Sequence, residues 1–255
     1  MKSSRLAVAA LCAAACLLAS VNAFAGSTNV AVAANFTDAV KEIAAKFKAR
    51  TGHDAVLSFG ASGQFYTQIK EGAPFQILLS ADDERPKKLI DDGLAVPESR
   101  FTYAIGKLVL WSKDASLVKG EETLQANAFN KLSIANPTAA PYGAAAVETL
   151  KALKLYDAVQ PKIVMGNTIS QAFQFVDTGN AELGFVALAQ LMPNAGGSRW
   201  MVPQNLYGEI RQDAVLLKSG ANNEAAIAFL AFLKGTEARE VIERFGYVID
   251  PKSGS

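Results

Sequence analysis

The stretch Val30-Ala-Val-Ala-Ala-Asn-Phe-Thr-Asp-Ala-Val40 decides the fold of this chain, because a strand pattern changes within it into a helical one. The short apolar run at 29–33 predicts a buried strand. The apolar residues that follow recur at the spacing of one helix face: Phe36, Val40, Ile43 and Phe47. Gly52 stands where a helix C-terminal glycine belongs. A strand, a small polar turn and a helix therefore follow one another directly.

The same alternation continues along the chain. Further short β-rich runs occur at 55–59, 75–80, 107–111, 131–135, 162–165, 183–186 and 214–217. Helical periodicity returns at 147–153, 169–176 and 227–233. Strands and helices that alternate at this spacing predict an α/β fold with largely parallel sheets covered on both faces.

Two lobes account for this pattern better than one sheet. The stretch Phe101–Trp111 is longer than a typical strand and predicts a crossing between lobes, and Trp200–Leu217 predicts the return. Paired crossings of this kind act as a hinge around a cleft. We expect a first lobe from 26–104, a second lobe from 105–205, and a segment from 206–255 that returns to the first.

The N-terminus has the pattern of an export signal. Lys2 and Arg5 precede an apolar run, and Ala23-Phe-Ala25 matches a cleavage site, so residues 1–25 are predicted to be removed after Ala25. The alternative is a membrane anchor, for which the run is shorter than the ~20 residues a spanning helix needs. The expected location is the periplasm. Both cysteines leave with this segment, so no disulfide is expected.

Charge and motifs exclude several functions. The chain has 25 basic and 24 acidic residues, and this balance offers no excess for binding nucleic acid. His53 is the single histidine, and we interpret it as a surface turn residue. Ser116-Leu-Val-Lys119 matches S-x-x-K without the motifs that accompany it in hydrolases. An exported serine hydrolase that uses Ser62 or the Ser116/Lys119 pair remains the alternative from another class.

Four strand-to-helix junctions carry the main functional signal. They run through Asn35, through Gly60-Ala-Ser-Gly63, through Asn136–Gly143 and through Gly166–Ser170. Each leaves free N–H groups at the positive end of a helix, a good environment for an anion. The alternative is that Asn35, Ser62 and Thr168 are simply N-caps. Four such junctions, two in each lobe, predict convergence on one small anion.

The motifs at these junctions resemble those of a known family. In sequence order they are Val32–Val40, Phe59–Gly63, Gly72–Asp82, Asn136–Gly143, Gly166–Phe173, Leu183–Val186, Leu233–Ala238 and Phe245–Tyr247. Their order and spacing are similar to those of the periplasmic molybdate-binding proteins of ABC importers, over nearly the whole chain after the signal. The resemblance implies a type II periplasmic-binding-protein fold, in which two α/β lobes close around a ligand cleft.

The resemblance also implies the ligand contacts. Asn35 falls where the family places a Ser or Asn whose side chain and N–H meet the oxyanion, and Ser62 falls on a serine that offers its hydroxyl and N–H. Tyr142 and Ile169 fall where backbone N–H groups are donated. Many relatives add a tyrosine hydroxyl where this sequence has Ala187. Tyr103 or Tyr142 could supply that hydroxyl instead.

The implied ligand is molybdate or tungstate, held by neutral donors without a direct metal ligand. Both are dianions without protons at neutral pH, and no Arg or Lys occurs within the four turns. Sulfate, thiosulfate or phosphate are the alternatives on the same fold. We expect no catalysis, no further cofactor, a monomer, and a membrane permease of an ABC importer as the partner.

Overall fold

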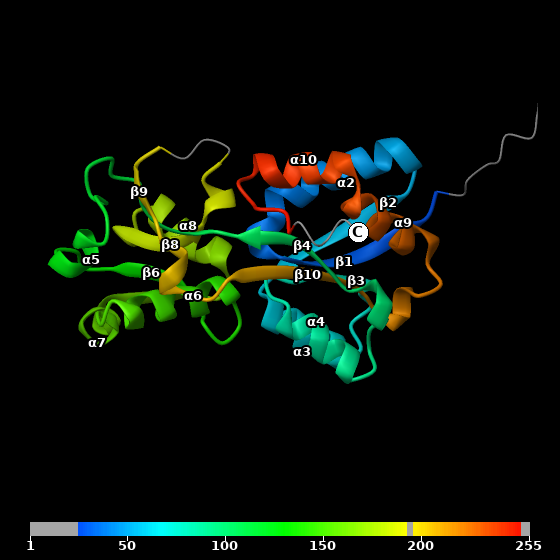
Figure 1. Cartoon of the computed structure of the whole chain (residues 1–255), viewed down its shortest axis with the longest axis horizontal. Helices are drawn as coiled ribbons and strands as arrows, with labels where there is room; N and C mark the ends of the chain where they lie inside the picture. The colour runs from blue at the N-terminus through cyan, green and yellow to red at the C-terminus, as the bar shows by residue number, and fades with distance from the viewer. Residues whose placement is uncertain (1–24, 193–195, 251–255) are drawn as a thin grey trace, which may run out of the picture.

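The computed structural model describes residues 25–192 and 196–250, which form two α/β lobes joined side by side (Figure 1). No helix within these residues is long and apolar enough to cross a bilayer. Residues 1–24 of the predicted signal peptide lie outside the described part of the chain.

The first lobe is built on a five-stranded sheet of order β2-β1-β3-β10-β4. Its strands are β1 (Ser27–Ala33), β2 (Asp54–Gly60), β3 (Ile77–Leu79), β4 (Phe101–Gly106) and β10 (Ile210–Leu216). Its α-helices are α2 (Thr37–Thr51), α3 (Ser62–Lys70), α4 (Glu84–Asp91), α9 (Glu224–Lys234) and α10 (Thr236–Arg244). Short 3-10 turns are η1 (Ala34–Phe36), η2 (Pro97–Ser99) and η6 (Lys218–Gly220).

The central strand β1 shows why helices cover both faces of this sheet. Val30 and Val32 point to the face packed by α2, α9 and α10, and Ala31 points to the face packed by α3 and α4. All three side chains are fully buried. A strand buried on both faces reads as a continuous apolar run, as residues 30–34 do.

The second lobe has a sheet of order β7-β6-β8-β5-β9. Its strands are β5 (Leu108–Ser112), β6 (Leu132–Ala135), β7 (Ile163–Gly166), β8 (Leu183–Ala187) and β9 (Ser198–Met201). Its helices are α5 (Glu122–Ala126), α6 (Pro141–Ala152), α7 (Tyr156–Val159) and α8 (Ile169–Asp177). Its 3-10 turns are η3 (Gln160–Lys162), η4 (Leu188–Gln190) and η5 (Gln204–Leu206).

The chain changes lobe twice, as the sequence predicted. It leaves the first sheet at the end of β4 and enters the second sheet at β5, and it returns from β9 to β10. Figure 1 shows these segments running between the lobes. The change of sheet occurs between Gly106 and Leu108 and again between Met201 and Ile210, while the lobe limits at 104/105 and 205/206 stay predictions.

The expectation of largely parallel sheets is wrong. Four of the eight strand pairings among the described residues are antiparallel, namely β3–β10, β10–β4, β5–β8 and β5–β9. The strands that carry the chain out of a lobe and back run in opposite directions, so they pair antiparallel with each other. The sequence also missed β9, because its four residues show no clear alternation.

Candidate functional site

The four predicted site residues line one small cavity between the lobes. Asn35, Ser62, Tyr142 and Ile169 all belong to its wall, although they come from four different junctions and two lobes. The cavity has a volume of about 10 Å³, counted as the space open to the centre of a water molecule, which is about the room that one water needs. Its lining residues are Ala33, Ala34, Asn35, Gly60, Ala61, Ser62, Ala81, Ala140, Pro141, Tyr142 and Ile169. None of these is charged, so any anion held here must rely on dipoles and neutral donors.

Ser62 presents a hydroxyl proton at the wall of the cavity. It is the first residue of α3 and its side chain is only 1% exposed. Its Oγ accepts the N–H of Ala81 at 2.9 Å. Because a hydroxyl that accepts still has its own proton to donate, and no acceptor for that proton occurs among the described residues, Ser62 is free to donate to a ligand.

Tyr142 and Ile169 bring two helix N-termini of the second lobe to the cavity. Tyr142 is the second residue of α6 and Ile169 is the first residue of α8. N–H groups in a first helical turn have no partner within the helix. The side chain of the cap residue Thr168 accepts the N–H of Gln171, at 3.1 Å, and does not use the N–H of Ile169. Both positions suit a backbone donor to an oxyanion.

Asn35 lies in the cavity wall in an orientation that the sequence did not predict. Its Nδ2 donates to Gln212 Oε1 at 2.8 Å and to Tyr247 Oη at 3.0 Å, which occupies both amide protons. Its Oδ1 is buried without any hydrogen-bond partner. In this arrangement neither amide proton is available to a ligand, so the donor role expected of the side chain requires the amide to turn.

The alternative that the junction residues are only N-caps holds for one of the three. Thr168 is the N-cap of α8 and makes the side-chain bond that defines a cap. Ser62 lies inside α3, whose N-cap is Ala61. Asn35 lies inside η1 and caps no helix. The side chains of Asn35 and Ser62 are therefore not used for capping.

Three buried tyrosines, of which Tyr142 lies in the cavity wall, have hydroxyl groups that stay protonated. Burial raises the pKa values of Tyr103, Tyr142 and Tyr247 well above the ordinary value. Tyr103 donates to Ser80 O at 3.0 Å and does not line the cavity. Tyr142 does line it, and its hydroxyl accepts from the Gln212 amide at 3.2 Å. Of the two tyrosines suggested to replace the donor missing at Ala187, Tyr142 belongs to the cavity wall and Tyr103 does not.

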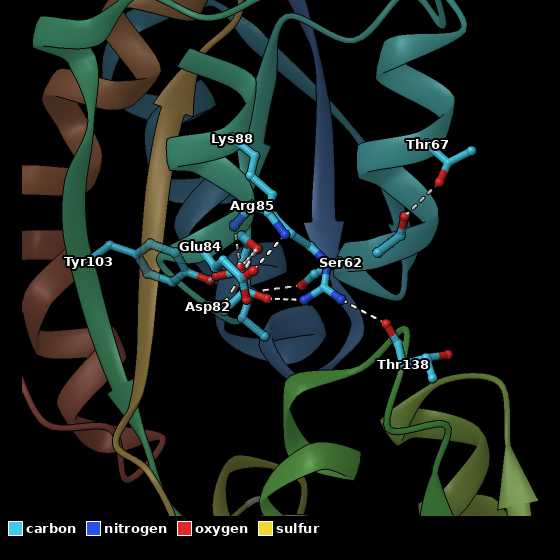
Figure 2. Close-up of polar contacts among 11 residues, drawn as sticks. Ser62, Thr67, Asp82, Glu84, Arg85, Lys88, Tyr103 and Thr138 are labelled. Atoms are coloured by element: carbon cyan, nitrogen blue, oxygen red, sulfur yellow. Dashed lines mark hydrogen bonds and ion pairs between the residues drawn. The ribbon is translucent and has the colours of Figure 1, made fainter. Parts of the chain in front are cut away.

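An arginine that sequence reasoning missed joins the lobes beside Ser62. Arg85 forms an ion pair with Asp82 and donates through Nη2 to Thr138 O, at 2.9 Å, across the interface (Figure 2). The neighbouring Gly63 N–H donates to Ala139 O at 2.9 Å. Arg85 comes from α4 rather than from one of the four turns, so the turn motifs gave no signal for it.

A third hydrogen bond joins the lobes on the other side of the cavity. Ser170 of α8 donates its hydroxyl to Ala34 O at 3.2 Å. Together with the bonds of Arg85 and Gly63, this contact means that the structure describes the lobes closed on each other. A wider groove of about 670 Å³ lies next to the cavity and is lined by charged residues, among them Arg85 and Glu148.

The residues proposed for catalysis are not arranged for it. The Ser116 hydroxyl donates to Asp114 Oδ1 at 2.8 Å, and no hydrogen bond joins it to Lys119 in the described part of the chain. His53 lies in the turn between α2 and β2, where its Nδ1 accepts the N–H of Gly26 at 2.9 Å. It is half-buried against Phe47 rather than fully on the surface. No cluster of three potential metal ligands occurs in the part of the chain that the structure describes.

Two closing α/β lobes with an uncharged, donor-lined cavity at their interface define a solute receptor rather than an enzyme. The sequence profile of the bacterial extracellular solute-binding proteins matches residues 28–248. The chain belongs to this family, and within it to the periplasmic molybdate-binding proteins.

The similarities to individual relatives are high. A molybdate-binding protein of Rhodobacter capsulatus is 54% identical over 89% of this chain and 90% of the relative. One of Azotobacter vinelandii is 54% identical over 88% of this chain and 90% of the relative. The solved structure described as the Azotobacter vinelandii periplasmic molybdate-binding protein superimposes with a TM-score of 0.85, covering 88% of this chain and 99% of that one at 42% identity.

Proposed function

We propose that this chain captures molybdate or tungstate through Asn35, Ser62, Tyr142 and Ile169 and delivers it to the membrane permease of an ABC importer. One observation carries the proposal: the four residues, which come from four separate junctions, line one cavity without a charged side chain. The relatives named above, at 54% identity, are molybdate-binding proteins.

The donor chemistry supports this class of ligand. Molybdate and tungstate have no proton at neutral pH, so every oxygen needs a donor and none needs an acceptor. A desolvated dianion is stable only where its oxygens are hydrogen-bonded, and bonds to charged groups are stronger than neutral ones. Helix N-termini at Ser62, Tyr142 and Ile169 supply N–H groups and dipoles that are already ordered.

The protein is an exported solute-binding component of an importer, as its family is. Cleavage of the signal after Ala25, action as a monomer and the absence of any cofactor are parts of the proposal. Sulfate, thiosulfate and phosphate remain the alternative ligands, because they use the same donors. Selection among these anions then depends on the size of the cavity when the lobes are closed.

Thermal melts of the chain from residue 26 test the ligand. We expect molybdate and tungstate to raise the melting temperature, since a ligand at a thousand times its Kd stabilises the folded state by about 4 kcal/mol. Sulfate, thiosulfate and phosphate at the same excess are the comparison. A shift with one of those anions and none with molybdate would contradict the proposed ligand.

Substitution of Ser62 tests the site. Ser62→Ala removes a hydroxyl donor to the oxyanion, and hydrogen bonds to charged groups contribute about 1.5–3 kcal/mol. We expect molybdate affinity, measured by isothermal titration calorimetry, to fall by about 10- to 150-fold. His53→Ala is the control, because His53 bonds Gly26 and is not part of the cavity wall. Full affinity in Ser62→Ala would remove that residue from the site.

Substitution of Arg85 tests the closed state. Arg85→Gln removes the cross-lobe bond to Thr138, so we expect molybdate to dissociate about five-fold faster, for a loss of about 1 kcal/mol. The association rate should not change, because this bond forms only after the lobes meet. Lys88→Gln is the matched control: it removes a cation of the same helix whose partner, Glu84, is local. Stopped-flow kinetics that show equal dissociation rates in both variants would refute this role.

A further inference from the structure

Gln212 connects the candidate ligand residues of the two lobes. It lies on β10, one of the two segments that cross between the lobes, and is fully buried. Its Oε1 accepts from Asn35 at 2.8 Å and lies 3.1 Å from the Tyr103 hydroxyl, whose one proton is shared with Ser80 O, and its Nε2 donates to Tyr142 at 3.2 Å. A single side chain therefore contacts one cavity residue of the first lobe and one of the second.

The backbone around Gln212 is shaped to leave room for these contacts. Gly106, the last residue of the other crossing strand, pairs with Ile210 of β10. A Cβ at Gly106 would lie 2.1 Å from the hydroxyl of Tyr142 and 2.7 Å from the Gln212 amide nitrogen. The register of β10 against β4 shifts directly after Gln212. A side chain at position 106 would thus displace the link between the lobes.

One atom of the Asn35 amide has no hydrogen-bond partner in this network. Its Oδ1 is buried without a partner, and a buried acceptor without a donor costs about 1–3 kcal/mol. Both amide protons meanwhile go to Gln212 and Tyr247. Because both amide protons are in use, the Asn35 side chain has no donor left for a dianion in the cavity, so this arrangement does not suit an occupied site.

Rotation of the two amides by 180° gives Asn35 Oδ1 a donor, although this oxygen then faces Tyr247 Oη, whose proton is donated to Asn35 O at 2.8 Å. Gln212 Nε2 then donates to Asn35 Oδ1, and Gln212 Oε1 accepts from the hydroxyl of Tyr142. Tyr103 keeps its bond to Ser80 O and accepts from the reversed Gln212 amide. The Asn35 Nδ2 takes the place of the unpartnered oxygen and becomes a free donor. The oxygen and nitrogen ends of an amide have nearly the same shape, so the packing does not change.

We propose that Gln212 is a positioning residue that sets the orientation of the Asn35 amide, and that an oxyanion in the cavity selects the reversed arrangement of both amides. Tyr142 then donates its hydroxyl proton to Gln212 on the crossing strand β10. Because Gln212 also bonds the Asn35 amide, this one side chain connects the ligand residues of both lobes. This inference rests on the proposed function and adds to it a residue that does not line the cavity.

Side-chain amide NMR of the unmodified protein tests the inference directly. On 15N-labelled protein the Asn35 and Gln212 NH₂ resonances are recorded with and without molybdate, and they are assigned with Asn35→Asp and Gln212→Met. We expect both amides to shift on saturation, since both exchange their partners. A shift of Asn35 with an unchanged Gln212 would overturn the inference.

Two substitutions of similar size distinguish orientation from packing. In Gln212→Glu the carboxylate accepts but does not donate, so it holds Asn35 Nδ2 away from the cavity; its charge also repels a dianion, and we expect molybdate affinity to fall by about 100-fold or more from the two effects together. Gln212→Met fills the same space without a polar group, and the expected loss is below about ten-fold. Equal losses in two folded variants would mean that Gln212 only fills space.

The outcomes separate this inference from the proposed function. If the unmodified protein does not bind molybdate, tungstate or another oxyanion in the melts, the proposed function fails and the inference fails with it. If the unmodified protein binds but the Gln212 amide does not respond, the proposed function stands and the role of Gln212 is wrong. Urea unfolding of each variant separates a loss of affinity from a loss of fold.

Discussion

Gly143→Ala is expected to lower molybdate affinity by about 100-fold, because it displaces a helix N-terminus of the site. A Cβ at Gly143 would lie 2.2 Å from the carbonyl oxygen of Ala135 and 2.7 Å from its carbonyl carbon. These are backbone atoms of β6, so no side-chain rotation relieves the contact. The N-terminus of α6 must then move away from the sheet by most of an ångström, and it takes the N–H of Tyr142 with it.

The structural cost of Gly143→Ala should be visible as well. Overpacking in a well-packed site costs about 1–3 kcal/mol, which urea unfolding measures, and calorimetry measures the affinity. Gly208→Ala is the matched control, because a Cβ there meets only Glu148 Oε2 at an ordinary 3.5 Å. Normal affinity in Gly143→Ala would show that the position of α6 does not set the geometry of the site.

Alkaline pH is expected to destabilise the protein steeply. Burial raises the pKa values of Tyr103, Tyr142 and Tyr247 well above 10, the ordinary value. Above about pH 10 the unfolded chain releases these three protons and the folded chain keeps them, so the free energy of unfolding falls as pH rises. Three protons correspond to a slope of about 4 kcal/mol per pH unit. Below the unfolded pKa this stability is fully present.

Urea unfolding between pH 8 and pH 11 measures this slope. Tyr247→Phe should make this slope shallower by the contribution of one proton, about 1.4 kcal/mol per pH unit, because one buried hydroxyl no longer titrates. Tyr66→Phe is the control, since Tyr66 lies in a half-exposed position where its hydroxyl bonds Asp92. The account fails if the two variants show the same slope. The comparison of slopes is independent of the stability that either substitution removes at neutral pH.

The sequence was sufficient for the features that depend on neighbouring residues. The change from a strand period to a helical period at Ala33 and Phe36 is local, and the structure has β1 and α2 there. Gly52, predicted at the end of that helix, has a φ of 77° and caps α2. The four junctions could be predicted in the same way, because the end of each strand and the start of the next helix lie close together in the sequence. That they line one cavity follows from the carboxyl ends of the strands meeting at one edge.

The hydrogen bonds that sequence reasoning missed join residues far apart in the chain. The Asn35 amide bonds Gln212 and Tyr247, which lie 177 and 212 residues away. Arg85 reaches Thr138 over 53 residues, and only because the lobes are closed. No local pattern marks such partners, since a buried Gln and an exposed Gln look the same in a sequence.

The sequence by itself therefore determined most of the elements, the two lobes, the family and the four junctions whose residues line one cavity. The tertiary structure alone decided the mixed direction of the sheets, the cross-lobe bond of Arg85 and the orientation of the Asn35 amide. The physical reason is the range of the forces involved. Backbone geometry and hydrophobic periodicity act over a few residues, whereas hydrogen-bond direction in a buried network is set by whichever distant groups packing brings within about 3 Å.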